Sequence, residues 1–157
     1  MTRRAAVIVA STRAANGIYV DRTGPLIVDW MRERGFSTGD PVVVADADVA
    51  AALRAAVQTA VDLVVTTGGT GIGADDQTAD ATAALLTAPL PGFSEELRRR
   101  GGAVTPFALL SRGVAGIAGR TFVVNLPGST GGVRDGLQLL GEVVDHVLDQ
   151  LGGGSHE

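Results

Sequence analysis

The residues best suited to chemistry lie in the glycine-rich segment 66–78, Thr-Thr-Gly-Gly-Thr-Gly-Ile-Gly-Ala-Asp-Asp-Gln-Thr. Its glycines allow the backbone to adopt positive φ and to approach a ligand closely. Successive N–H groups in such a loop form a concave anion site, and a helix that follows adds the positive end of its dipole. The segment therefore favours phosphate as its ligand. A flexible turn without a ligand is the alternative, because short glycine motifs are weakly specific.

Two carboxylates accompany this loop: Asp76 ends it, and Asp46 follows an earlier apolar run. A carboxylate beside a phosphate makes electrostatic sense if Mg²⁺ lies between them, or if the carboxylate orients a reactant. Each also has a structural alternative. Asp75 and Asp76 would favour a helix dipole by about 0.3–1 kcal/mol each, and Asp46 suits a turn or a cap. Together the loop and the carboxylates favour Mg²⁺-assisted phosphoryl or nucleotidyl transfer.

Composition excludes several other chemistries. The 157-residue chain has no cysteine and all 13 of its basic residues are arginine, so thiol nucleophiles, Cys-ligated metals, Schiff bases and a Walker A lysine are excluded. Neither His146 nor His156 is placed for a Ser-His-Asp triad. The net charge of −4 disfavours nucleic acid as a partner. We expect the arginine triplet 98–100 on a solvated helix face, with attraction of an anionic partner as the alternative.

Short apolar runs alternate with segments of helical period, which predicts strands and helices in turn. The runs are continuously apolar, as is typical of strands buried on both faces of a parallel sheet. We expect Asp48 and Ser129 to be helix N-caps. The expected strands span 5–10, 41–45, 61–66, 114–118 and 121–125, and the expected helices span 24–34, 49–60, 79–87, 92–100 and 130–151.

This order of elements predicts a single α/β domain over residues 1–151, followed by a flexible tail at 152–157. The expected fold is a three-layer sandwich with a mostly parallel sheet and helices on both faces. Gly119-Arg120 is expected to turn a hairpin that makes one antiparallel edge. Ligands of such sheets bind beyond the carboxyl ends of the strands. Segment 125–129, which follows the last strand, suits either a Pro-Gly turn before a helix or a ligand-binding turn.

Several motifs, in the same order along the chain, resemble the MogA/MoaB family of molybdenum cofactor biosynthesis proteins. The most specific are Thr-Thr-Gly-Gly-Thr-Gly at 66–71 with Asp-Gln-Thr at 76–78, and Asn-Leu-Pro-Gly-Ser at 125–129. Segments 11–25, 91–93 and 105–112 are similar to the family's first loop and middle part. The resemblance therefore spans nearly the whole chain.

The resemblance implies a molybdopterin adenylyltransferase, which joins the terminal phosphate of molybdopterin to AMP from Mg-ATP and releases pyrophosphate. It also implies a homotrimer and a molybdenum insertase as a partner. The family's important aspartates fall on Asp46 and Asp76, which would be catalytic and would bind Mg²⁺. The substrate- and nucleotide-binding residues would be Ser11, Thr67, Gly68, Gly69, Thr70, Gly71, Thr78, Ser111, Asn125, Pro127, Gly128 and Ser129.

The chain departs from the family pattern at Gly131, where many relatives carry lysine, at Thr12, which replaces an acid, and at Ala79, which replaces proline. These departures leave two alternatives open: a non-catalytic molybdopterin-binding or carrier protein, and a related nucleotide pyrophosphatase-type activity. The apolar run 5–10 is too short for a signal sequence or a membrane span. We therefore expect a cytoplasmic protein that does not associate with membranes.

Overall fold

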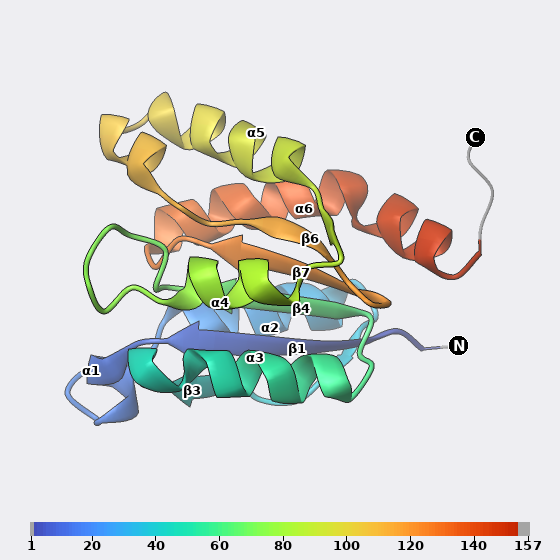
Figure 1. Cartoon of the computed structure of the whole chain (residues 1–157), viewed down its shortest axis with the longest axis horizontal. Helices are drawn as coiled ribbons and strands as arrows, with labels where there is room; N and C mark the ends of the chain where they lie inside the picture. The colour runs from blue at the N-terminus through green and yellow to red at the C-terminus, as the bar shows by residue number, and fades with distance from the viewer. Residues whose placement is uncertain (1, 154–157) are drawn as a thin grey trace.

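The computed structural model describes residues 2–153 and has the alternating order of strands and helices that the sequence predicts (Figure 1). The strands are β1 Arg4–Ala10, β2 Ser37–Thr38, β3 Val42–Val44, β4 Leu63–Thr67, β5 Ala88–Pro89, β6 Ala115–Ala118 and β7 Thr121–Leu126. The helices are α1 Thr12–Ala15, α2 Thr23–Glu33, α3 Val49–Gln58, α4 Thr78–Leu85, α5 Pro91–Gly102 and α6 Thr130–Leu151, and two 3₁₀ segments are η1 Asp46–Asp48 and η2 Pro106–Leu110.

A single mixed sheet lies at the centre of the described chain. Its order is β2-β1-β4-β7-β6-β5, and β3 pairs with the later part of β1. The pairs among β1, β2, β3, β4 and β7 are parallel, whereas β6 is antiparallel to both β7 and β5. The predicted β6–β7 hairpin is confirmed, with Gly119 at φ +64° in its turn. The hairpin is not the edge, however, because β5 adds one more strand beyond β6.

Helices cover both faces of the sheet, which confirms the predicted three-layer α/β architecture (Figure 1). Successive residues of the central strands point to opposite faces. On β1, Val7 packs in the core that α2, α5 and α6 cover, while Ile8 packs in the core that α3 and α4 cover. The register aligns Val7 with Val65 of β4, and Val65 with Val124 of β7. These aliphatic rows hold the three central strands in register and so bring their carboxyl ends to one edge.

Most predicted element boundaries are correct to within one or two residues, and the exceptions have local causes. Ser129 caps α6 as predicted, since its Oγ accepts a 3.1 Å hydrogen bond from the Gly132 N–H. Asp48 occupies the N-cap position of α3 as predicted, but its side chain makes no capping hydrogen bond, because Asp48 belongs to the 3₁₀ turn η1 and already has helical backbone angles. The one-turn helix α1 and the two-residue strands β2 and β5 were not predicted, because elements this short carry no periodic pattern. Of the expected tail, residues 154–157 lie outside the described part.

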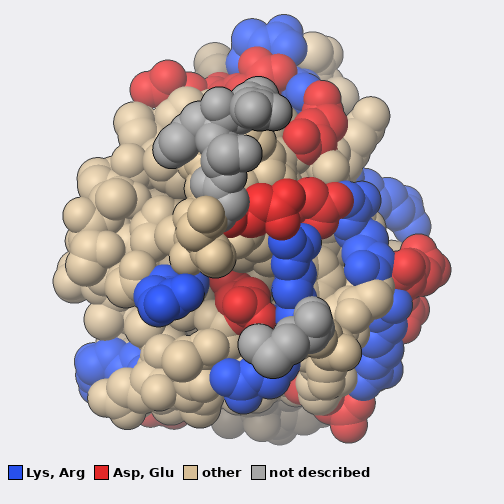
Figure 2. Space-filling view, turned by 90° about the vertical axis from the view of Figure 1, so that its right-hand side faces the viewer, with Lys and Arg blue, Asp and Glu red and all other residues tan. Residues whose placement is uncertain are grey.

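The surface around the chain ends mixes charges of both signs. Figure 2 shows acidic and basic side chains interspersed on this face rather than gathered by sign. Arg3 pairs here with Asp145 at 3.0 Å, and Arg34 reaches the same carboxylate at 3.4 Å, so the start of the chain is tied to α6. Within residues 2–153, no helix is both long and apolar enough to cross a membrane.

Candidate functional site

The loops that follow β1, β4 and β7 meet at the carboxyl edge of the sheet, and their backbones pack directly on one another. The Gly68 N–H donates to the Leu126 carbonyl at 3.2 Å, and Thr67 Oγ1 donates to the Pro127 carbonyl at 2.7 Å. Gly68 has φ +86°, and a Cβ there would collide with the carbonyl oxygen of Ala10. Glycine is therefore required at 68 because the ends of β1 and β4 approach within backbone contact.

The glycine loop folds around the Asp76 side chain. Asp76 Oδ2 accepts a 2.9 Å hydrogen bond from the Gly73 N–H, and Cβ atoms at Gly71 and Gly73 would lie 2.8 and 2.9 Å from this oxygen. Gly69, at φ +69°, lies against Thr78, whose N–H donates to the Gly69 carbonyl at 3.1 Å. The Thr78 hydroxyl is buried here without a hydrogen-bond partner. The glycine spacing thus permits a compact loop that encloses its own carboxylate.

A pocket of about 660 Å³ opens between this loop, the N-terminus of α6 and the α5–η2 segment. This volume suits a drug-sized or cofactor-sized ligand. The pocket includes seven of the predicted binding residues: Thr70, Gly71, Ser111, Asn125, Pro127, Gly128 and Ser129. The structure therefore brings the two specific motifs, 66–71 and 125–129, into one cavity.

The pocket lining combines polar and apolar groups. Gly71 of the glycine loop is part of it, as are Gly128 and Ser129, which directly precede the 22-residue helix α6. The first N–H groups of a helix have no acceptors within it, and the helix dipole places partial positive charge there. Leu97 of α5 and the exposed Phe107 of η2 add apolar surface to the same lining. Such a cavity is suited to a ligand that carries both an anionic group and a flat, weakly polar group.

The side chain of Asn125 supports the pocket through hydrogen bonds to the elements around it. Its side chain is buried, and Nδ2 donates to Thr66 Oγ1 at 2.9 Å and to Thr82 Oγ1 at 3.0 Å. Its Oδ1 accepts from the Val114 N–H at 3.1 Å. Because these bonds use both amide protons and the oxygen, the side chain joins β7 to β4, α4 and the start of β6. Asn125 thus holds together the elements that carry the pocket loops.

The remaining predicted residues lie outside the pocket wall: Ser11, Asp46, Thr67, Gly68, Gly69, Asp76 and Thr78. Ser11 caps α1 and its hydroxyl bonds the Tyr19 hydroxyl at 3.1 Å. Asp46 accepts a 3.1 Å hydrogen bond from Thr12 Oγ1, so it is bonded to the first loop, whereas Asp76 is bonded within the glycine loop. The two carboxylates therefore occupy separate loops and have separate partners.

Mg²⁺ needs oxygen ligands, and the described part of the chain offers few of them together. Within that part, no group of three or more His, Cys, Asp or Glu side chains is placed to hold a metal ion. A cage made by protein ligands alone therefore does not fit. Mg²⁺ commonly keeps several waters and binds through one or two carboxylates plus substrate phosphates. Asp46 and Asp76 each supply a carboxylate of the kind that this second arrangement uses.

The α5 wall of the pocket was missed by sequence reasoning. Its lining residues Ser94, Leu97, Arg98 and Gly101 follow the spacing i, i+3, i+4, i+7, which places them on one helix face. This spacing could have indicated one face of a pocket-lining helix from the sequence, whereas the three consecutive arginines indicated only a charged, solvated helix face. Arg98 Nη1 donates to the carbonyls of Ser111 and Gly113, both at 3.2 Å. Arg98 thus fixes the turn that carries Ser111 into the pocket.

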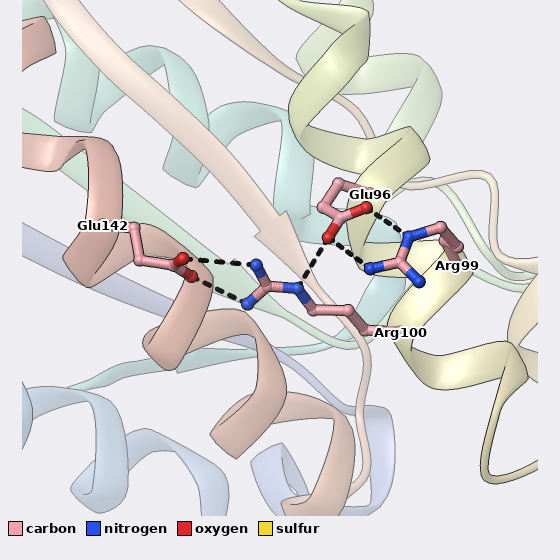
Figure 3. A network of polar contacts seen from close by, with 4 residues as sticks. All are labelled: Glu96, Arg99, Arg100 and Glu142. Atoms are coloured by element: carbon pink, nitrogen blue, oxygen red, sulfur yellow. Dashed lines mark hydrogen bonds and ion pairs between the residues drawn. The ribbon is translucent and has the colours of Figure 1, made fainter.

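The other two arginines of the triplet are neutralised by glutamates, contrary to the alternative of a free anion-binding patch (Figure 3). Arg99 Nε donates to Glu96 at 2.6 Å, and Arg100 bonds both Glu96 and Glu142 at 2.8 Å. The hydrogen bonds from Arg99 and then Arg100 lower the pKa of Glu96 from 4.5 to about 2. Because Glu142 lies on α6, this network ties α5, the pocket wall, to α6.

Together these features define an α/β domain whose loops, at the carboxyl edge of a mostly parallel sheet, line a pocket with both polar and apolar groups. Residues 6–146 match the family described as "Probable molybdopterin binding domain", and the chain belongs to this family. The resemblance seen in the motifs is thereby confirmed.

Named relatives agree with this membership. The chain is 33% identical over 152 residues to a molybdopterin adenylyltransferase from Helicobacter pylori, covering 94% of this chain and 86% of the relative. It is 38% identical over 154 residues to a molybdenum cofactor biosynthesis bifunctional protein from Synechococcus elongatus, covering 97% of this chain and 48% of the relative. The chain thus spans about half the length of that bifunctional relative. The structure of the molybdopterin biosynthesis Mog protein from Mycobacterium ulcerans superposes with a TM-score of 0.92 at 52% identity, covering 96% of this chain and 99% of that one.

Proposed function

We propose that this chain is a molybdopterin adenylyltransferase that acts in molybdenum cofactor biosynthesis. The observation that carries the proposal is the pocket of about 660 Å³ in which both motif segments meet. Its backbone N–H groups suit phosphate and its apolar side chains suit a flat heterocycle, as molybdopterin phosphate and ATP require. The name of the Helicobacter pylori relative supports the same activity. We propose that residues 1–151 form one functional domain.

The proposed binding roles follow from where each group lies. Backbone N–H groups of Thr70 and Gly71 bind phosphate on one side, and Gly128 and Ser129 at the start of α6 bind it on the other. Ser111, held on its turn by Arg98, contacts the pterin. The remaining predicted residues act from outside the pocket wall, by shaping the loops. Thr67, Gly68, Gly69 and Thr78 hold the glycine loop, and Ser11 holds the first loop.

The proposed reaction is an in-line displacement at the α-phosphorus of ATP. A phosphate oxygen of molybdopterin forms a new P–O bond while the bond to the bridging oxygen of the β-phosphate breaks, and that electron pair leaves with pyrophosphate. The attacking phosphate is largely ionised at neutral pH because its second pKa is about 6. No protein base is required, so catalysis rests on positioning and on charge stabilisation by fixed dipoles.

Asp46 and Asp76 are proposed to hold Mg²⁺ together with the phosphates of ATP. When bound, the ion neutralises the charge that develops on the pyrophosphate leaving group. Asp46 is half-buried beside Thr12, and Asp76 is held by the Gly73 N–H, so both carboxylates are acceptors held at fixed places. We further propose that the protein forms a homotrimer, that it is cytoplasmic, and that a molybdenum insertase receives its product.

Pyrophosphate release from Mg-ATP, measured with and without molybdopterin, tests this proposal. We expect release that depends on molybdopterin. A specific observation favours a second candidate, a molybdopterin-binding or carrier protein: both aspartates already accept hydrogen bonds from the protein, Asp46 from the first loop and Asp76 within the glycine loop. Binding of molybdopterin without any pyrophosphate release would favour the carrier. Release from ATP alone would contradict both and favour a pyrophosphatase-type activity.

A further inference from the structure

Arg112 lies beside the pocket and makes contacts that neither the motifs nor the proposed reaction explains. It follows the pocket residue Ser111 directly and precedes β6. Its backbone N–H donates to the Thr70 carbonyl at 2.8 Å. The turn at 111–113 is therefore joined to the glycine loop at the point where that loop enters the pocket.

The Arg112 side chain spans both ends of the loop segment 71–76. Nε donates to the Gly71 carbonyl at 3.0 Å, and Nη2 donates to the Asp76 carbonyl at 3.2 Å. Nη1 donates to the carboxylate of Asp80, at 3.1 and 3.3 Å, in the first turn of α4. One planar guanidinium thus joins the start of the segment, its end and the helix that follows.

Little else in the described structure holds segment 71–76 to the rest of the molecule. Its other hydrogen bonds are internal, between Gly73 and Asp76, at 2.9 and 3.1 Å. The Ile72 side chain is 75% exposed, so apolar burial does not anchor the segment either. Within residues 2–153, every hydrogen bond between segment 71–76 and residues outside it comes from Arg112.

We propose that Arg112 is a positioning residue that fixes the glycine loop, and with it Asp76 and the phosphate-binding part of the pocket. The catalytic part of this inference rests on the proposed function, whereas the loop-fixing part does not. Arginine is needed because three donors must point to three acceptors in one plane. Lysine carries one compact charge and cannot reproduce that fork. The ion pair with Asp80 contributes less to the position of the loop, because the hydrogen bonds from Arg112 to the Gly71 and Asp76 carbonyls persist without it.

Hydrogen exchange tests the loop-fixing part directly. In Arg112→Gln and Arg112→Lys we expect the amides of Gly73, Asp76 and Thr78 to exchange at least about tenfold faster, because the loop opens locally. The Tm should stay within a few degrees of wild type, since no core side chain is touched. Arg54→Gln is the matched control, because Arg54 lies exposed on α3, away from the loop. Unchanged exchange at these amides in both Arg112 variants would overturn the proposal.

Steady-state kinetics test the catalytic part. A misplaced loop should lower kcat for molybdopterin-dependent pyrophosphate release by about 100-fold in both Arg112 variants, with a much smaller change in KM for ATP. Asp80→Asn should have a smaller effect than either. Wild-type kcat in the variants, together with faster exchange, would reject the positioning role. If wild-type protein releases no pyrophosphate at all, the proposed function fails, and the exchange result still decides whether Arg112 fixes the loop.

Discussion

Single glycines determine whether the pocket loops can approach one another. We predict that Gly68→Ala lowers the free energy of unfolding by at least about 2 kcal/mol, because it combines φ +86° with a clash against the Ala10 carbonyl. Gly131→Ala is the control: a Cβ there meets no atom within 4 Å, and it lies in the first turn of α6. This control should gain about 0.5–1 kcal/mol. Urea unfolding of both variants checks the pair, and equal stabilities would contradict the backbone argument.

The charge of Asp76 can be separated from its structural role. In Asp76→Asn the amide oxygen still accepts from the Gly73 N–H, so the loop keeps its 2.9 Å hydrogen bond while the negative charge is lost. We predict that molybdopterin-dependent turnover falls by about 100-fold or more, with fold and ATP binding retained. The matched control is Asp75→Asn, because Asp75 is adjacent and exposed. Wild-type turnover in the Asp76 variant would remove this residue from the catalytic set.

The sequence predicts the role of a residue where that role depends on the residue's own backbone or on a nearby residue. The glycines of 68–73 and the cap Ser129 were found because each depends on its own backbone or on a residue nearby. Arg112 and Arg98 were not found as parts of the site, because their partners are distant carbonyl groups. A carbonyl has no sequence signature, so a contact to it becomes visible only once the fold is known.

Among the elements, α5 carries ion pairs of Glu96 with Arg99 and Arg100 within the helix, and Arg100 also pairs with Glu142 of α6. The lowered pKa of Glu96, about 2 instead of 4.5, means that its pairing stabilises the fold fully above about pH 4.5. That contribution is lost as the pH falls through 2. We predict that the stability difference between wild type and Glu96→Gln is largest near neutral pH and shrinks from pH 4.5 towards pH 2. Urea unfolding at several pH values measures it, and a difference that grows on acidification would contradict it.

Salt offers a second measure of the Glu96 pairing within α5. The side chains of Arg100 and Glu96 are 28% and 31% exposed, so solvent ions screen their interaction. Glu95→Gln is the matched control, because Glu95 is an exposed neighbour on the same helix. The stability difference between the two variants should decrease in 1 M salt. An effect of Glu96→Gln that is independent of salt would point to packing instead of charge.

Element boundaries were predictable where a hydrophobic pattern continued for at least four residues. The central strands β1, β4 and β7 satisfy this condition, since they are apolar on both faces. Strands β2 and β5 do not, because each has only two residues and forms through pairing with a neighbour. Asp48 lies at the predicted N-cap position of α3, but the short turn η1, of which it is part, gives it helical backbone angles and its side chain makes no capping hydrogen bond.

At the scale of the whole molecule, assembly is the property to measure. The proposed homotrimer predicts a sedimentation mass of three chains of 15.9 kDa each. A mass that corresponds to one chain across micromolar concentrations would contradict it. The same run at 1 M salt separates charge-driven from apolar association, because Debye screening weakens only the former.

The overall architecture was predictable because a parallel sheet places all strand carboxyl ends on one side. That rule brought segments 66–71 and 125–129 together correctly. It does not specify which side chains line the resulting cavity. Asp46 and Asp76 both lie at the edge of the sheet that was predicted. Asp46, however, is hydrogen-bonded to the first loop, Asp76 is hydrogen-bonded within the glycine loop, and neither lines the pocket. Proximity to an edge therefore predicts a region, whereas the hydrogen bonds of each loop decide orientation.

The start of β1 and the end of α6 both lie at the edge of the sheet opposite the glycine loop (Figure 1). Anything attached beyond Arg4 or Leu151 therefore departs from the molecule on the side away from the pocket mouth. An immobilising tether or a fused fluorescent reporter at either position would leave substrate entry unobstructed. The same geometry suits the domain to tandem fusions, because a neighbouring domain attached at either end would leave the pocket mouth open.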